Sequence, residues 1–487
     1  MSRISRRTWM TIAGLTGAAM AGRTALGSPV GMDAPAAGNS PGSDRSFSCD
    51  VLQFGAKGDV KTDDTAAFQK ALDAMHSADG GIVHVPAGRF LIAGSLNVPQ
   101  GVVLQGVFHG PTSHANFRDG VAIPPPTADG TMLLATGGRG MEDGTPLITQ
   151  EANTTVAGLT IFYPDQNWET APVEYPWTIR MHGNNCTVDN VELVNPWRGI
   201  KAVLASRHLI RNVTGQPLRV GIFVDEIYDI GRIENVHFYP WWKGVPVMHN
   251  FMHQYGESFI FGRTDWEYVL NTFSIDYHIA YHFIEGKTGA CNGNFLGIGA
   301  DGSQYAFVIE SVQQPGLLIT NGEFVSLGAA EWATNGPSKP TGAADVSIED
   351  GPIQVLVKEG MNKRVWNRGP VRFVNCSFWG PCRQIARLES DTTLGFGDCT
   401  FCQWDKAYPA IAALAGDLSV NFCDFRQTGQ QVYLGPQVNQ AVIAGNMARS
   451  KWKIVNDATR GDVQIGLNSS SLREHDAIDP QEHDVPH

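Results

Sequence analysis

The chain has 487 residues, of which 54 are glycine and 43 % are hydrophobic, and its formal net charge is −12. This acidic balance, without any lysine-rich tract, argues against nucleic acid as a partner. After the N-terminal region no apolar run approaches the length of a membrane span, so no membrane partner is expected for the processed protein. The composition is typical of a soluble, turn-rich β protein.

The N-terminus reads as a targeting signal. Residues 5–10 are SRRTWM, followed by a weakly apolar run at 12–21 and small residues near Gly27. A twin arginine before such a run resembles a bacterial Tat export signal, here residues 1–27, and predicts a periplasmic or extracellular protein. A disordered basic start of a cytosolic protein is the alternative. Residues 28–46 are rich in Gly, Pro, Ser and Ala and are predicted to be a flexible linker.

The folded part is predicted to begin with a short helix followed by strands. Asp63 and Asp64 precede an amphipathic stretch, TAAFQKAL, which is typical of a capped helix start. From Gly80 to Gly106, three short strands are predicted between the turns PAG and PQG. The folded part is therefore predicted to open with one helix and then to continue in strands.

This N-terminal segment carries a family resemblance. FGAKGD, TDDTAAFQKAL and GGIVHVPAGRFLI together resemble the start of the pectate-lyase-like superfamily, which includes polygalacturonases and rhamnogalacturonases. The resemblance implies a right-handed parallel β-helix whose N-terminal end is covered by this segment. It implies little about chemistry, because the superfamily contains hydrolases, lyases, epimerases and phage tailspikes.

A repeat further along the chain predicts the same fold independently. The words VNCSF, GDCTF and NFCDF place Cys376, Cys399 and Cys423 at steps of 23 and 24 residues, each two residues before a Phe. Equivalent positions occur in DNVEL, RNVTG, ENVHF and NGEFV, at similar steps. Short β-rich words at one period predict coils that bury their apolar side only by stacking on each other.

The predicted fold class is therefore all-β, a single-stranded right-handed parallel β-helix with an N-terminal capping helix. The β-helix domain is expected to occupy residues 47–467, followed by a disordered tail at 468–487. Loop insertions are expected at about 109–145, 164–177, 245–311 and 329–348, where the coil pattern is interrupted.

Three of the eight cysteines are assigned to the core. Cys376, Cys399 and Cys423 are predicted to be an interior column of small apolar thiols. A disulfide between Cys382 and Cys399 or Cys402 is left open. No cysteine–histidine spacing resembles a zinc site, so no metal or other cofactor is predicted, although Ca²⁺ would be expected if the protein were a lyase.

The first candidate for chemistry lies between Gly256 and Phe283. If 260–268 is extended, alternation places Arg263, Asp265 and Glu267 on one face, with the carboxylates roughly 6.7 Å apart. Two carboxylates at about this distance suit the cleavage of a glycosidic bond, and the arginine would keep one of them ionised. A structural ion-pair cluster is the alternative.

Further candidates are other carboxylates and two histidines. Asp225 on a neighbouring coil is a possible partner of Asp265 or Glu267, and Asp301 lies in the sequence GADGS. Both are also compatible with ordinary turns. His278 and His282 lie further along the first stretch, on another common face. The carboxylate pair, Gly-His-Gly and Arg-Ile-Lys words of polygalacturonases are absent, so no catalytic residue is carried over from that family.

Aromatic side chains suggest a sugar substrate. Trp197, Trp241 and Trp242 follow the core positions of their coils and are expected along one corner, whereas Trp168 and Trp266 lie in the insertions and Tyr281 lies near the histidines. Ring faces with a polar handle stack well on sugar rings. Packing against the core is the alternative for about half of such residues.

The sequence thus predicts an exported enzyme that cleaves a polysaccharide, with hydrolysis by paired carboxylates favoured. β-Elimination on a uronate polymer is the enzymatic alternative, with Arg263, Tyr281 and the two histidines available as base or cations. A non-catalytic glycan-binding β-helix, such as an adhesin or a tailspike, is the third possibility. The oligomeric state is not predicted.

Overall fold

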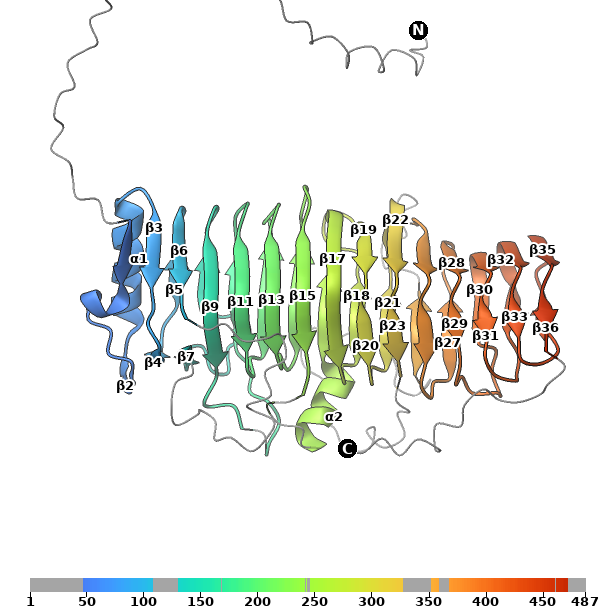
Figure 1. Cartoon of the computed structure of the whole chain (residues 1–487), viewed down its shortest axis with the longest axis horizontal. Coiled ribbons are helices and arrows are strands. Elements are labelled where there is room, and N and C mark those ends of the chain that lie inside the picture. Colours follow the sequence, from blue (N-terminus) through green and yellow to red (C-terminus); the bar gives the residue numbers. More distant parts are fainter. Residues whose placement is uncertain are drawn as a thin grey trace, which may run out of the picture. The chain divides into compact units, whose positions relative to one another are not determined.

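The computed structural model describes residues 47–107, 130–167, 169–240, 242, 246–326, 352–358, 368–459 and 461–471. They belong to one compact unit, in which successive coils are stacked along one direction (Figure 1). All strand pairings are parallel, as in a β-helix. No helix in the described ranges is long and apolar enough to cross a membrane.

The N-terminal end of the stack is covered as predicted. Strand β1 (Ser48–Asp50), the 3₁₀ helix η1 (Val51–Phe54) and strand β2 (Asp59–Asp63) precede helix α1 (Thr65–Ser77), whose apolar side is buried. Asp64 does not cap the helix through its side chain; its carboxylate instead accepts the backbone N–H groups of Lys57 (2.7 Å) and Gly58 (3.0 Å). The helix covers the first coil, whose N-terminal edge would otherwise be exposed to solvent.

Each coil contributes to three parallel sheets. The first sheet consists of β5 (Leu96–Val98), β8 (Ile148–Gln150), β10 (Trp177–Met181), β12 (Arg198–Val203), β14 (Val220–Asp225), β16 (Glu257–Phe261), β18 (Ile279–Phe283), β21 (Tyr305–Ile309), β24 (Ile353–Val357), β27 (Gln384–Leu388), β30 (Ile411–Asn421), β32 (Val432–Ala444) and β34 (Ile454–Asn456). The second contains β1, β3 (Gly81–His84), β6 (Val102–Gln105), β9 (Thr155–Phe162), β11 (Thr187–Leu193), β13 (Leu209–Gly215), β15 (Arg232–Phe238), β17 (Thr264–Ile275), β19 (Cys291–Leu296), β22 (Val312–Thr320), β25 (Val371–Val374), β28 (Thr393–Gly397), parts of β30 and β32, and β35 (Asp462–Gly466).

The third sheet begins with β2, β4 (Gly88–Ile92) and β7 (Thr131–Ala135) and continues through the second halves of the bent strands β9 to β17. It ends with the short strands β20 (Gly299–Asp301), β23 (Glu323–Val325), β26 (Ser377–Trp379), β29 (Thr400–Phe401), β31 (Asp424–Phe425), β33 (Met447–Ala448) and β36 (Ser469–Ser470).

The periodic column predicted from the sequence lies in the third sheet. Phe324 pairs in register with Phe378, which pairs with Phe401, which in turn pairs with Phe425. Their ring centroids are 5.1, 5.7 and 4.9 Å apart. The three cysteines two residues earlier are buried, and all eight cysteines are free thiols, so the disulfide left open for Cys382 is not formed.

Asparagines stabilise the bend between the second and third sheets. Asn212, Asn235 and Asn271 have φ angles of +52°, +55° and +51°, a left-handed conformation that asparagine tolerates better than most residues. Asn235 donates its amide to Asn212 (2.8 Å), and Asn271 donates to Asn235 (3.0 Å). Consecutive coils are thus linked outside the core by a chain of side-chain hydrogen bonds.

Some predicted loop boundaries are wrong. The insertion expected at 109–145 contains strand β7, and the span 245–311 contains helix α2 (Pro246–Tyr255) followed by six strands, β16 to β21. The ionisable and aromatic residues that suggested an irregular span belong largely to these elements. The insertion at 164–177 is largely non-regular, 329–348 lies outside the described residues, and β36 extends the last coil beyond residue 467.

Candidate active site

The outer face of the first sheet carries aligned basic and aromatic side chains. Arg180 on β10 pairs in register with Lys201 on β12, which pairs with Phe223 on β14. Neighbouring parallel strands lie roughly 4.8 Å apart, so these three side chains form a continuous row across the coils. The steps between them are 21 and 22 residues, close to the coil period, although no such row was predicted from the sequence.

Lys201 and the neighbouring Arg198 rest against aromatic rings. Lys201 Nζ lies 5.8 Å from the ring of Trp177 and 5.7 Å from that of Phe223, and the Arg198 guanidinium lies 4.8 Å from Trp177. Burial lowers the pKa of Lys201, and the charges of Arg180 and Arg198 lower it further. Arg180, Arg198 and Lys201, here called the cationic patch, are therefore held close together despite their repulsion.

One member of the cationic patch, Arg198, is paired with an acidic side chain. Arg198 Nη1 lies 3.4 Å from Glu142, which also accepts the indole N–H of Trp197 (3.0 Å). Arg198 is thereby neutralised and oriented. Arg180 and Lys201 remain as the cations that an anionic ligand on this face would meet.

Asp225 ends strand β14 beside this face. Its Oδ1 accepts the backbone N–H groups of Glu226 (2.8 Å) and Arg263 (2.7 Å). Burial raises its pKa, whereas these two hydrogen bonds lower it. The following coils place Gly262 and Gly286 against the carboxylate, where a Cβ would lie 2.4 and 2.3 Å from Oδ1. The missing side chains leave room for the carboxylate at this corner.

Arg263 connects Asp225 to Asp265. Its Nη2 donates to Asp265 Oδ2 (3.0 Å), its Nη1 donates to the carbonyl of Thr288 (3.2 Å), and its guanidinium stacks on Tyr228 at 4.9 Å. Asp265 Oδ1 also accepts the amide of Gln313 (2.7 Å). Of the predicted catalytic residues, the structure therefore brings Asp225, Arg263 and Asp265 together at one corner.

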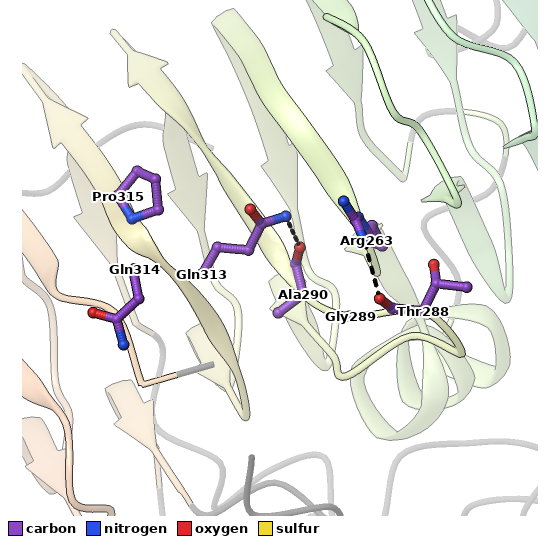
Figure 2. A pocket seen from close by; sticks show the side chains of 7 residues that line it. All are labelled: Arg263, Thr288, Gly289, Ala290, Gln313, Gln314 and Pro315. Carbon is purple, nitrogen blue, oxygen red and sulfur yellow. Dashed lines mark hydrogen bonds between the residues drawn. The ribbon is translucent and has the colours of Figure 1, made fainter. Parts of the chain in front are cut away.

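A pocket opens at this corner (Figure 2). It encloses about 270 Å³ and is lined by Arg263, Thr288–Ala290 and Gln313–Pro315, which come from the turns and strand starts of successive coils. We call it the corner pocket. Its lining combines the guanidinium of Arg263 and the side chains of Thr288 and two glutamines with the apolar surface of Ala290 and Pro315, a mixture suited to a sugar ring.

Glu267 does not share the face of Asp265, contrary to the prediction. Its side chain is 0 % exposed, and its Oε1 lies 3.0 Å from His208 Nε2. The register between β17 and β19 shifts between Thr264 and Glu267, and the intervening Trp266 has a φ of +59°. This β-bulge breaks the alternation on which the prediction relied and turns Glu267 inwards.

His282 lies in a buried ionic network. Its Nδ1 is 2.7 Å from Glu257, which also contacts Arg219 (2.9 Å), and its Nε2 is 3.5 Å from Glu310. Despite the opposing effect of burial, the two glutamates raise the pKa of His282 to about 9, and the histidine together with Arg219 lowers that of Glu257 to about 2. Lys358 completes the chain at 3.2 Å from Glu310.

His278 and Asp301 lie elsewhere. His278 is buried near Gln304 and the backbone of His253, and burial lowers its pKa to about 4. Asp301 ends β20 in the third sheet, where burial and the charge of Asp276 raise its pKa. Neither residue is placed beside Asp225 by any described contact.

The predicted tryptophan row is not formed by the described residues. Trp197 and Trp242 are buried, with Trp197 packed on Phe251 of α2 at 5.3 Å. Trp168 and Trp241 lie outside the described residues. Trp266 is 61 % exposed, as expected of a ligand-stacking residue. Tyr281 is a core residue, stacked between Phe259 (5.1 Å) and Phe307 (5.3 Å).

No group of three or more His, Cys, Asp or Glu side chains suited to hold a metal ion is found in the described ranges. The carboxylates at the corner are instead engaged by Arg263, Gln313 and backbone N–H groups. The described residues therefore do not fit the Ca²⁺ site considered for a lyase.

Comparisons with known proteins agree with the fold. Residues 48–127 match the family model "Rhamnogalacturonase A/epimerase, pectate lyase-like". Alginate lyase 7 of Azotobacter vinelandii is 48 % identical over 54 residues, 11 % of this chain and 6 % of that protein. Mannuronan C5-epimerase AlgE3 of the same organism is 54 % identical over 44 residues, 9 % of this chain and 2 % of that protein. The matches thus span a small part of these relatives.

A solved structure resembles the chain over most of its length. The N-terminal fragment of bacteriophage phi29 gene product 12 aligns with a TM-score of 0.51 and 14 % identity, covering 88 % of this chain and 73 % of that one. This likeness concerns the fold. Together with the three-sheet coil, it shows a parallel β-helix, and the N-terminal segment of the chain is similar to the pectate-lyase-like family model.

Proposed function

We propose that the protein is an exported enzyme that modifies an acidic polysaccharide at the outer face of the first sheet. The observation that carries this proposal is the row of Arg180 and Lys201 on the face where Asp225 follows Phe223 by two residues, with Lys201 close enough to lower the pKa of Asp225 by its charge. In a chain with a net charge of −12, cations held together on one face favour an anionic ligand. Export by the Tat-type signal is part of the same proposal.

The chemistry that this arrangement supports best is proton transfer at C5 of a uronate. Arg180 and Lys201 would bind the sugar carboxylate and stabilise the negative charge that develops when the C5 proton leaves. Asp225 would accept that proton. Expulsion of the C4 oxygen, which takes up a proton in turn, gives an unsaturated product, whereas return of a proton to the opposite face gives the C5 epimer.

The relatives support this choice of substrate class. The names of the matched proteins refer to alginate and mannuronan, both of which are uronate polymers. Their similarity extends over only 54 and 44 residues of this chain, so the support comes from the class of substrate and not from a shared catalytic residue. The row of cations on the outer face supplies the independent argument.

Hydrolysis is the second candidate, and the contacts that two carboxylates make with Arg263 favour it. Asp225 and Asp265 both engage Arg263, the first through the backbone N–H and the second through the guanidinium. Two carboxylates at one corner are the requirement of most glycoside hydrolases, one as the acid and the other as the base or nucleophile. This keeps Asp265 from the pair expected from the sequence and replaces Glu267 by Asp225, which the sequence also offered as a partner of Asp265.

The test is a panel of uronate and neutral polysaccharides incubated with the purified protein. Ultraviolet absorbance of new double bonds reports elimination, reducing ends without absorbance report hydrolysis, and uptake of solvent deuterium at C5 reports epimerisation. We expect activity on uronate polymers only. Action confined to neutral glycans would contradict the proposal, and glycan binding without any product would favour the non-catalytic alternative.

Two variants assign the roles. Asp225→Asn is expected to lower kcat by about 100-fold or more, because a general base typically contributes 10²–10⁴-fold. Lys201→Gln is expected to lower kcat/KM on the same polymer, with Lys70→Gln on the remote helix α1 as the matched control. Unchanged turnover in Asp225→Asn would remove this carboxylate from the mechanism.

A further inference from the structure

We propose that the corner pocket is a binding subsite for one sugar unit of the polysaccharide, with Trp266 as its external stacking platform. The inference rests on the proposed function for the identity of the polymer. The pocket's volume of about 270 Å³ lies just below the roughly 300–1,000 Å³ usual for sites of drug-sized ligands, a size that suits a single ring.

The pocket is built by two irregularities in neighbouring strands. In β22, the residues from Val312 to Leu317 occupy the place of only Cys291 to Gly293 in β19, so Gln313 to Gly316 bulge out of the sheet. On the other side of β19, the segment of β17 from Thr264 to Glu267 pairs with the same stretch, Cys291 to Gly293, and contains an extra residue, which forms a second bulge. Bulges re-aim side chains and are common beside functional sites. Two of them flank this pocket.

The polar wall is rigid before any ligand arrives. Gln313 Nε2 donates to the carbonyl of Ala290 (2.6 Å) and to Asp265 (2.7 Å), and its Oε1 accepts from Asn292 (2.8 Å). Arg263 is fixed by Thr288 and Asp265, as Figure 2 shows for the contact with Thr288. A wall fixed in this way costs little conformational entropy on binding.

Trp266 has a conformation that packing alone does not explain. It is 61 % exposed, yet its backbone adopts a φ of +59°, a left-handed conformation that is strained for a residue with a large side chain. Its N–H donates to Asn292 (3.2 Å), and Asn292 donates to Gln313. The strained residue and the pocket wall are therefore parts of one hydrogen-bonded unit, which presents an indole to solvent.

The pocket also adjoins the proposed reaction centre. Arg263 lines the pocket with its side chain, while its backbone N–H donates to the carboxylate of Asp225 at 2.7 Å. A polymer with a uronate unit beside Asp225 would meet the corner pocket with a neighbouring unit. Residues of the pocket would then position long substrates without touching the reacting atoms.

The experiment compares Trp266→Ala and Gln314→Ala with the wild type, using short and long oligouronates. Each substitution is expected to raise the Kd and the KM of the long oligomer roughly 3- to 10-fold, through the loss of a stacking contact at Trp266 or of a polar contact at Gln314, with kcat and the short oligomer unchanged. Trp379→Ala, which removes an indole that is 40 % exposed on a remote coil, is the matched control and should change nothing.

The outcomes separate this inference from the proposed function. An active wild type with both pocket variants unchanged on the long oligomer would overturn the subsite alone. An inactive wild type that binds glycans in a manner dependent on Trp266 would support the subsite and refute the enzymatic proposal. A wild type that neither turns over nor binds any oligouronate would overturn both.

Discussion

Replacing His282 by Gln should destabilise the protein in a manner that depends on pH. The imidazole lies between Glu257 and Glu310, and its pKa is raised to about 9 from an ordinary value of 6.5. At about 1.4 kcal/mol per pKa unit, the protonated ring contributes of the order of 3 kcal/mol to the folded state, counted once for the whole network. Breaking a buried pair by removing one partner typically costs about 3–5 kcal/mol, which agrees with this figure.

The sign of the pH dependence follows from the raised pKa. The contribution of His282 is complete below about pH 6.5 and is lost as the pH rises through about 9. Glu257, whose pKa is lowered to about 2 from 4.5, contributes above pH 4.5 and loses its contribution as the pH falls through about 2. The network should therefore stabilise the fold most between about pH 4.5 and pH 6.5.

The assay is urea unfolding followed by tryptophan fluorescence, at roughly pH 6 and roughly pH 10. His282→Gln should lose about 3 kcal/mol of unfolding free energy at the lower pH and much less at the higher pH. His84→Gln, which changes an exposed histidine of β3, should match the wild type at both. An equal loss at both pH values would refute the ionic origin of the stabilisation, and no loss at the lower pH would refute the network itself.

Three further predictions follow from buried or bent positions. Glu267→Gln should lose about 1–3 kcal/mol of stability through its contact with His208 but keep its turnover per folded molecule, and a selective fall in kcat would restore its catalytic assignment. The pKa values of Cys382 and Cys399 are raised to about 12; burial is the main cause for Cys382, whereas for Cys399 the hydrogen bond with Cys376 lowers the pKa and the Cys423 thiol and burial outweigh it. Both thiols should resist thiol reagents until the protein is denatured, and rapid labelling of native protein would contradict this. Asn235→Ala should cost about 1–3 kcal/mol, because it breaks the side-chain link to Asn212 and strains a left-handed bend, and an unchanged urea midpoint would show that the link is dispensable.

The fold could be predicted because its signal is repeated. Phe378, Phe401 and Phe425 recur at one period, and each recurrence reinforces the same phase, so local irregularities do not erase the pattern. The capping helix was found for a different reason, since an acidic pair before an amphipathic run is a local signal. Helix α2 was not predicted, because it occurs only once among the coils and no acidic pair precedes it as one precedes α1.

The site was predicted only in part, because its geometry depends on exceptions to the repeat. Glu267 was expected beside Asp265 by strict alternation, which the bulge at Trp266 breaks. A large aromatic residue with a positive φ gives no warning in a sequence. The row from Arg180 to Lys201 was missed because each residue, taken alone, resembles an ordinary surface charge; only the step of 21 residues relates them.

The asparagine links between coils bear on how such a chain can change its length. Each coil pairs only with the coil before and the coil after it, so a duplicated or deleted coil would still find matching neighbours at the bend. Its effect on the site would be different, since a single added coil between β14 and β16 would separate Asp225 from Arg263 by roughly a further 4.8 Å. Gain or loss of whole coils is thus compatible with folding almost anywhere, but compatible with the proposed chemistry only away from this corner.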